Sequence, residues 1–281
     1  MIKRLSSDDI SRFEEICASL AIPLSESGES IGTFNEKRVH RAIKRFITED
    51  ESHHEIKVGS SVADVLHDGV IYEIQTGSFS PLKKKITAYL AASCNYVRII
   101  YPIVVKNRIV RLETSTGEVL RTRTVNTKKS ARDILPELIY LSDFLKNPAL
   151  CFDVYLIETE ERRYSDNVYR YRRKGRRDSE TFPVSLKEII SLETTDDFLS
   201  LLPTPLLLKA GLTESELWDA SAEPAETEKS SRDDFSFTAA EFASLSGLVG
   251  RKAYLALGAL VALGILEKQK DGNKAAVFRF K

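Results

Sequence analysis

Residues 61–75 read SVADVLHDGVIYEIQ, and this stretch decides how the first part of the chain folds. Two arms rich in β-branched and apolar residues flank Asp68-Gly69, a strong signal for a two-residue type I′ turn. Because antiparallel partners step outward from such a turn one at a time, Asp64 falls directly opposite Glu73. The register therefore predicts two carboxylates side by side on one face of a hairpin.

Like charges directly opposite each other destabilise a sheet, so this pair needs an explanation. A divalent cation such as Mg²⁺ is one, because it binds carboxylate oxygens and leaves positions open for water and phosphate. Gln75 falls on the same face as Glu73, since side chains alternate along a strand. The opposite face would be directed at a core and would carry Ala63, Val65, Tyr72 and Ile74. The alternative is a pair of solvated carboxylates neutralised by Lys83, Lys84 or Lys85.

The composition is that of a globular protein. With 281 residues the chain is longer than one typical domain and about right for two. Basic and acidic residues both number 41, so only the distribution of charge is informative. The cysteines Cys17, Cys94 and Cys151 lack metal-ligand spacing and are interpreted as buried thiols in a reducing compartment. No apolar run is long enough for a membrane span and no secretory signal is recognisable, so we expect a soluble cytoplasmic protein without a membrane partner.

The pattern around the hairpin predicts an α/β class with a mixed sheet. A helix is expected from about residue 33 to 48, and another after Ser80-Pro81. Residues 96–104 read as a buried strand ending near a proline, and residues 108–112 and 119–123 as a second hairpin. A helix over 134–145 and a strand over 151–157 follow. Further short helices are expected over 184–202 and 213–220.

Residues 221–234 are small, acidic or polar and are expected to form a linker. Beyond it, a helix from Thr238, a turn at Ser246-Gly247, a helix over 251–263 and a terminal hairpin match a winged helix-turn-helix. Arg251 and Lys252 lie at the start of the second helix, where side chains would reach DNA, although winged helices also bind proteins. The expected domains are 1–160, a basic and helical connecting region 161–220, the linker 221–234 and the winged helix 235–281.

The order of elements over residues 33–104 resembles the core of the PD-(D/E)XK nucleases. The matching residues are Glu36 on the first helix, Asp64 on one strand and Glu73-Ile74-Gln75 on the next. The resemblance implies a restriction-endonuclease-like αβββαβ core, in which Asp64, Glu73 and the Ile74 carbonyl bind Mg²⁺ or Mn²⁺. Glu36 would complete the coordination or hold a water.

The chain departs from the family pattern at Gln75, which stands where a lysine is usual. A neutral amide orients water but does not lower its pKa by charge. Some relatives with this variant recruit a lysine from the following helix, and Lys85 is the preferred candidate here. The alternative is a site that keeps its shape without activity.

Residues 162–177 read RRYSDNVYRYRRKGRR and concentrate positive charge in one place, interleaved with tyrosines that could stack on bases. The alternative is a solvated loop balanced by Glu158, Glu160 and Glu161. The expected nucleic-acid contacts in this run are Arg162, Arg163, Arg170, Arg172, Arg173, Lys174, Arg176 and Arg177.

These observations favour a metal-dependent DNA endonuclease in which Gln75 orients the water and Lys85 offsets developing charge. Cutting both strands with one site per chain would favour a homodimer. A catalytically inactive, nuclease-like protein that binds DNA or regulates another protein is the alternative. His40 shares a helical face with Glu36, so it could contact phosphate or move a proton, although a packing role is the plainer interpretation.

Overall fold

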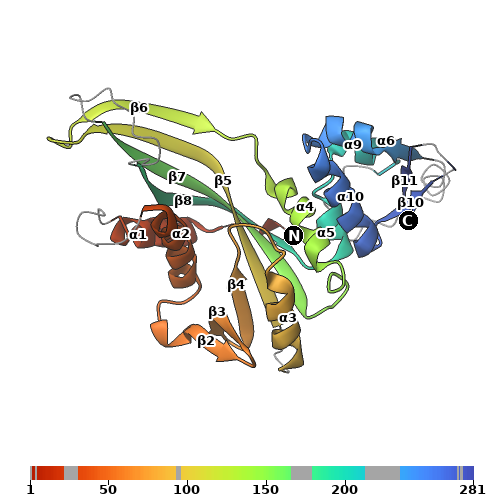
Figure 1. The fold of residues 1–281 in the computed structure, drawn as a ribbon, viewed down its shortest axis with the longest axis horizontal. Coiled ribbons are helices and arrows are strands. Elements are labelled where there is room, and N and C mark those ends of the chain that lie inside the picture. Colours follow the sequence, from red (N-terminus) through yellow and green to blue (C-terminus); the bar gives the residue numbers. More distant parts are fainter. Residues whose placement is uncertain are drawn as a thin grey trace.

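The computed structural model describes residues 2–3, 5–21, 31–92, 96–165, 179–212, 235–270, 272 and 275–281 (Figure 1). For residues 2–3, 31–37 and 165 it describes the backbone only. The expected helix over 213–220 and the expected linker lie outside these ranges, as do residues 166–177 of the basic run.

The described part of the chain is built around one mixed sheet in the order β1-β8-β7-β5-β4-β3-β2, with β6 paired to the outer part of β5. Strands β4, β5 and β7 run parallel to one another, and the remaining pairs are antiparallel. The strands are β1 Ile2–Lys3, β2 His54–Val58, β3 Ser61–His67, β4 Val70–Ile74, β5 Tyr96–Glu113, β6 Val119–Asn126, β7 Leu150–Ser165 and β8 Ser179–Leu192. The mixed sheet with helices confirms the expected α/β class.

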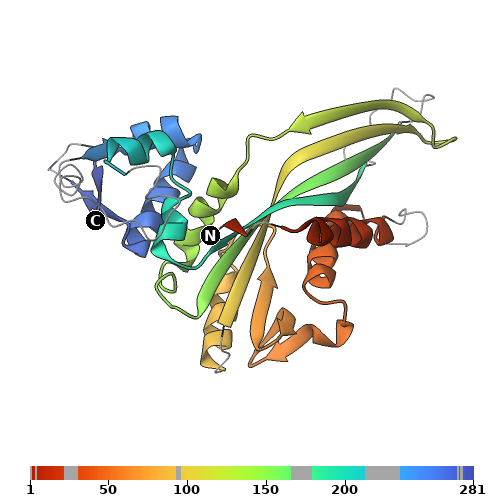
Figure 2. The same cartoon turned by 180° about the vertical axis from the view of Figure 1, so that it is seen from behind.

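Helices cover both faces of this sheet. The helices up to residue 209 are α1 Ser7–Ser19, α2 Ile31–Ile47, α3 Leu82–Ala91, α4 Leu135–Leu138, α5 Thr195–Leu199 and α6 Thr204–Lys209, with 3-10 turns η2 Glu51–His53, η3 Ala131–Ile134 and η4 Ile139–Leu141. Of these, α6 lies beside α9 (Ala239–Ser246) of the C-terminal unit (Figure 1). Neighbouring residues of one strand point to opposite faces: Ile100 packs with α1 and α2, whereas Ile99 packs with α3 and α4. Figure 2 shows β5 to β8 continuing away from α3 as a long curved ribbon, with α1 and α2 along one side of it.

The C-terminal residues form a smaller unit with its own sheet, in the order β10-β11-β9. Its elements are β9 Ser236–Thr238, α9 Ala239–Ser246, α10 Arg251–Leu263, β10 Leu266–Gln269 and β11 Val277–Phe280. The expected sequence of two helices and a terminal hairpin is therefore present. Helix α10 packs against α4, and its buried residues belong to the same hydrophobic core as α3 and the sheet.

Among the described residues, no single helix is long and apolar enough to cross a membrane. Helices α9 and α10 pass that test only as a pair, and they meet at a bend of 106°.

The predicted hairpin is confirmed near its turn, where His67 pairs with Val70 and Val65 with Tyr72. The ladder between β3 and β4 ends there, and the backbone N–H of Ile74 donates instead to Oδ2 of Asp64, at 2.8 Å. The prediction that Ala63 and Ile74 share one face is wrong, because they belong to different core clusters. The Asp64 carboxylate thus accepts the hydrogen bond that a backbone carbonyl of β3 would accept if the ladder continued.

Three expectations about the sheet are corrected. Strand β5 does not end near Pro102. On this edge β4 pairs with β5 only as far as Ile100, and β6 pairs with β5 only from Lys106 onward, so no neighbouring strand needs a hydrogen-bond donor at the proline. Residues 184–192 belong to strand β8 rather than to a helix. Strand β7 also crosses the domain boundary expected at residue 160, and β8 extends the same sheet.

Candidate functional site

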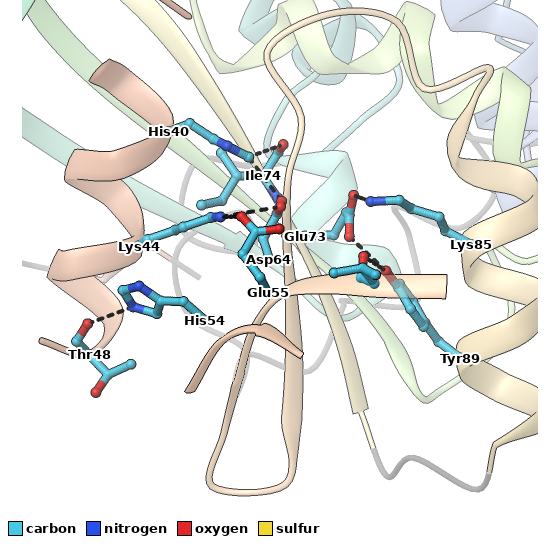
Figure 3. A network of polar contacts seen from close by, with 11 residues as sticks. His40, Lys44, Thr48, His54, Glu55, Asp64, Glu73, Ile74, Lys85 and Tyr89 are labelled. Atoms are coloured by element: carbon cyan, nitrogen blue, oxygen red, sulfur yellow. Dashed lines mark hydrogen bonds and ion pairs between the residues drawn. The ribbon is translucent and has the colours of Figure 1, made fainter. Parts of the chain in front are cut away.

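Two helices on opposite faces of the sheet bring polar side chains to the ends of β3 and β4 (Figure 3). Asp64 is 7% exposed and Glu73 is 3% exposed, so both carboxylates are largely withdrawn from water. A buried carboxylate is costly unless hydrogen bonds or opposite charges compensate for the lost hydration. The partners of the two residues therefore define what the site can do.

Asp64 is held from the side of α2. Its Oδ2 atom lies 2.9 Å from Nε2 of His40 and accepts the Ile74 amide, and its Oδ1 atom lies 3.8 Å from Nζ of Lys44. Burial acts to raise the pKa of Asp64, but the hydrogen bond and charge of His40, the Ile74 amide and Lys44 together hold that pKa below its usual value. Asp64 is therefore an ionised carboxylate at neutral pH.

His40 stands between two oxygen atoms. Its Nε2 atom lies 2.9 Å from the Asp64 carboxylate and 3.0 Å from the Ile74 carbonyl oxygen. Both neighbours are acceptors, so the chemistry of the pair places a hydrogen on Nε2. The side chain thus puts a donor at the point on which the Asp64 carboxylate and the Ile74 carbonyl converge.

Glu73 is held from the side of α3. Lys85 forms an ion pair with its Oε1 atom, and the Tyr89 hydroxyl lies 2.9 Å from its Oε2 atom and 2.8 Å from the Val62 carbonyl oxygen. Burial and then the charge of Asp64 raise the pKa of Glu73, while Lys85 and Tyr89 oppose that rise. Asp64 and Glu73 are thus close enough to influence each other's ionisation.

The two carboxylates nevertheless take different partners. Figure 3 shows Asp64 directed toward His40 and Lys44, and Glu73 directed toward Lys85 and Tyr89. The expectation that they lie opposite each other on one face of the hairpin is wrong, because pairing stops at Val65 and the two side chains contact helices on opposite faces of the sheet. Within the described ranges no three His, Cys, Asp or Glu side chains gather closely enough to hold a metal ion.

The atoms present still fit a cation in part. The Asp64 carboxylate and the Ile74 carbonyl are hard oxygen donors of the kind that Mg²⁺ and Mn²⁺ prefer, and they converge on a common point. A cation there would replace the hydrogen on Nε2 of His40. Glu73 would be the second carboxylate of such a site; in this structure it contacts Lys85 and Tyr89.

The other predicted site residues are placed as follows. Lys85 does face the hairpin, as expected, whereas Lys83 pairs with Asp143 instead. The side-chain amide of Gln75 donates to the Ser78 carbonyl at 2.6 Å, and no described contact joins it to Asp64 or Glu73. Glu36 lies in α2, one turn before His40, and its side chain is outside the described part.

The hairpin is tied to α2 by further contacts. Lys44 pairs with Glu55, and Nε2 of His54 lies 3.0 Å from the carbonyl oxygen of Thr48, which follows α2. Glu55 lies opposite Asp64 between two paired positions of β2 and β3, and its φ is 54°. This left-handed conformation is unusual for a residue other than glycine, and it occurs where the pairing of β2 with β3 omits one residue pair.

Sequence reasoning missed three residues of this cluster. From the sequence, packing is the plainer interpretation of His40, and neither Lys44 nor Tyr89 is predicted to be a site residue. A signal was present, because Glu36, His40 and Lys44 follow one another at spacings of four residues, as do Lys85 and Tyr89. Residues four apart share a helix face, so each set could have been recognised as one polar row.

The predicted nucleic-acid residues are only partly described. Arg162 hydrogen-bonds Glu160 and stacks over Phe182, and Arg163 hydrogen-bonds Glu161, so acidic neighbours balance both. Arg251 and Lys252 are exposed at the start of α10. The remaining predicted contacts lie outside the described ranges: Arg170, Arg172, Arg173, Lys174, Arg176 and Arg177.

Comparison with known proteins places the chain in a family. No solved structure matches it. An uncharacterized protein of Treponema pallidum (strain Nichols) is 27% identical over 183 residues, which cover 64% of this chain and 69% of that protein. The family described as "Domain of unknown function (DUF8091)" matches residues 37–193, from within α2 to the end of β8. Since this match spans more than half of the chain, including both carboxylates, the protein belongs to the DUF8091 family.

Proposed function

We propose that this protein is a metal-dependent phosphodiester hydrolase that acts on DNA. The single observation that carries the proposal is the convergence of the Asp64 carboxylate and the Ile74 carbonyl on one point, with Glu73 and Lys85 beside it. Buried carboxylates with opposed pKa shifts are typical of catalytic sites, although structural ion pairs also produce them. The resemblance of residues 33–104 to PD-(D/E)XK nucleases supports the same class of reaction.

Each residue has a role that its position supports. Asp64, Glu73 and the Ile74 carbonyl would hold Mg²⁺ or Mn²⁺, and Glu36 could complete the set. A bound cation would supply an activated water and stabilise charge on the phosphate. Lys85 would offset negative charge that develops on the phosphate, because its ammonium group already lies at the Glu73 carboxylate. Gln75 would orient the water only after leaving Ser78.

His40 has two roles open to it in such a site. It could coordinate the cation through Nε2 after losing the hydrogen, or it could turn away and exchange a proton with the attacking water. Either role depends on Asp64, the carboxylate that His40 contacts in this structure.

Cleavage of DNA by purified variants tests the proposal. Asp64→Asn and Glu73→Gln each remove one carboxylate charge with little change in shape, so we expect both to abolish cleavage in Mg²⁺ or Mn²⁺. Asp68→Asn is the matched control, because it removes the same charge from the exposed turn of the same hairpin, where Asp68 is 86% exposed. Circular dichroism should show that all three variants stay folded. Cleavage that survives in both site variants, or that persists in a chelator, would reject the assignment.

A protein that binds DNA without cutting it is the second candidate. It is favoured by one observation: Gln75, which stands in place of the usual lysine, is engaged with Ser78 rather than with the carboxylates. Calorimetric titration with Mn²⁺ separates the two candidates. A hydrolase should bind the ion and lose that binding in Glu73→Gln, whereas a binding module should bind DNA equally well in a chelator and should not bind the ion.

A further inference from the structure

A second group of basic residues lies on the outer part of the sheet, away from the carboxylates. On the face of the sheet turned away from α2, residues of β5, β6 and β7 line a hollow of about 120 Å³: Ile109, Arg111, Arg121, Arg123 and Arg163. Strand β6 is exposed along almost its whole length. Four of the five lining residues are arginines, so the hollow concentrates positive charge and would attract an anion.

The strand register arranges these arginines in a row. Arg121 on β6 pairs directly with Arg111 on β5, and Arg111 pairs in turn with Arg163 on β7. Arg123 lies two residues from Arg121 on the same face, opposite Ile109. Like charges directly opposite each other destabilise a sheet, so the row costs stability unless an anion compensates.

Acidic residues balance only one of these four arginines. Arg163 hydrogen-bonds both carboxylate oxygens of Glu161, at 2.8 and 3.0 Å. Within the described residues no carboxylate forms an ion pair with Arg111, Arg121 or Arg123. We name these three residues the arginine row.

The opposite face of the same strands is different. There Arg108 lies 3.6 Å from Glu160, and Lys106 lies 3.3 Å from Glu158. Basic residues on that face therefore have acidic partners, so a generally basic sheet does not explain the arginine row.

We propose that the arginine row binds the phosphate backbone of DNA at the far end of β5 from the site on β3 and β4; this inference rests on the proposed function. Ile74 pairs with Ile100, eleven residues before Arg111, so a DNA duplex would have to span roughly 36 Å between the two places. Neighbouring strands are about 4.8 Å apart and alternate residues of a strand about 7 Å apart, so the guanidinium groups form a flat array rather than a cup for one ion. An array of this kind suits successive phosphates of a chain, to which arginine donates bidentate hydrogen bonds.

The position of the row supports a nucleic acid as its occupant. Ser165, where the chain leaves β7 toward the basic residues 170–177, pairs with Glu113 at the end of β5. The chain returns from those residues at Ser179, which pairs with Arg163. The end of the sheet that carries the arginine row is thus the end at which the chain leaves toward this basic sequence.

DNA binding at several salt concentrations tests the inference. The protein carries Asp64→Asn to prevent cleavage, and the anisotropy of a short fluorescein-labelled duplex is measured in a chelator. The slope of log K against log salt falls by roughly 0.9 for each phosphate contact that is lost. We therefore expect the double variant Arg111→Gln/Arg121→Gln to bind more weakly and to lower the slope by about 2. The double variant Lys106→Gln/Arg108→Gln, on the opposite face of β5, removes the same charge and should leave the slope unchanged.

Stability provides an independent readout. Removing two arginines that face each other should leave the melting temperature unchanged or raise it, because repulsion is relieved. Weaker DNA binding together with an equal or higher melting temperature would support the inference. An unchanged slope in the double variant, or binding to phosphatidylglycerol vesicles in place of DNA, would overturn it.

The outcomes separate this inference from the proposed function. A wild-type protein that cuts DNA while the double variant binds with an unchanged slope would reject the arginine row alone. A wild-type protein that does not cut DNA, but whose binding depends on Arg111 and Arg121, would support the row and reject the hydrolase.

Discussion

The Nε2 atom of His40 lies 2.9 Å from the Oδ2 atom of Asp64, so residues 24 positions apart in the sequence share one hydrogen bond across the junction of a helix and a hairpin. The same nitrogen lies 3.0 Å from the Ile74 carbonyl oxygen. His40 therefore contacts both of the oxygen atoms that would bind the proposed cation, which makes this residue central to the proposed reaction.

Changing His40 should affect catalysis more than folding. We expect His40→Ala to lower DNA cleavage by about 10²-fold or more, the range typical of a lost proton-transfer group. His67→Ala, on the same hairpin at the turn, should cleave at the wild-type rate. Single-turnover cleavage at saturating Mn²⁺ measures both variants. Equal rates for the two would show that His40 has only a packing role.

Lys85 should set the pH dependence of cleavage through Glu73. Burial and the charge of Asp64 raise the pKa of Glu73, and Lys85 lowers it. Only the ionised carboxylate binds a cation, so cleavage should fall as the pH falls through the Glu73 pKa. Removing Lys85 removes a charge that favours ionisation, so the acid limb of the profile should move to higher pH in Lys85→Ala.

A second lysine of α3, Lys83, provides the control for Lys85. Lys85→Ala should also lower cleavage at neutral pH by about 10²-fold, as expected for a group that stabilises developing charge. Lys83→Ala removes the same charge from α3 but breaks only the exposed pair with Asp143, so its profile should match the wild type. Identical acid limbs in all three proteins would contradict the assigned role of Lys85.

The turn of the hairpin could be predicted because its cause is local. Asp68-Gly69 needs positive φ values, and the structure has 49° and 75° there, so the register follows for the adjacent pairs. The departure at Asp64 could not be predicted, because it depends on a carboxylate that accepts the Ile74 amide and on a helix that docks beside it. Local turn chemistry thus defines three ladder pairs, and tertiary contacts define the rest.

Strand β8 shows why hydrophobic periodicity predicts a helix over residues 184–192 where the structure has a strand. Both faces of β8 are covered, so Leu186 and Ile189 pack with α1 and α2 while Ile190 and Leu192 pack in the other core. A strand that is buried on both faces lacks clean alternation and is hard to distinguish from a helix by pattern. Register shifts near Ile157 and Thr159 of β7 disturb the pattern further.

The thiol of Cys17 should be unreactive in the folded protein. Burial, and then the charge of Glu14, raises the pKa of Cys17 to about 12. Because the thiolate is the reactive form, iodoacetamide in mildly alkaline buffer should label Cys17 only after denaturation. Peptide mass spectrometry measures the labelled fraction. Rapid labelling of Cys17 in the native protein would show that α1 separates readily from the sheet.

The buried ion pair between Arg38 and Glu180 should anchor α2 to the sheet. Their side chains are 3% and 4% exposed, and Tyr164 donates a further hydrogen bond to Glu180. Removing one partner of a buried ion pair leaves the other charge buried without compensation. We therefore expect Arg38→Met to lower the free energy of unfolding by about 3–5 kcal/mol. Lys83→Met, which breaks a pair exposed by 57% and 62%, should cost only about 0–1 kcal/mol. Urea denaturation measures both, and equal losses would contradict the anchoring role.

The close approach of α10 to η4 at Gly258 should control how the C-terminal unit docks. A Cβ atom at Gly258 would lie 3.0 Å from Cδ1 of Ile139, so any side chain there must displace Ile139. In Gly258→Ala the gain in helix propensity, about 1 kcal/mol, opposes this crowding, and we expect a net change near zero. Gly258→Leu is too large for the space and should destabilise the protein by about 1–3 kcal/mol. Adding Ile139→Ala makes room, so the double variant Gly258→Leu/Ile139→Ala should lose less stability than the sum of the two single changes. Strictly additive losses in urea denaturation would show that the two residues do not press on each other.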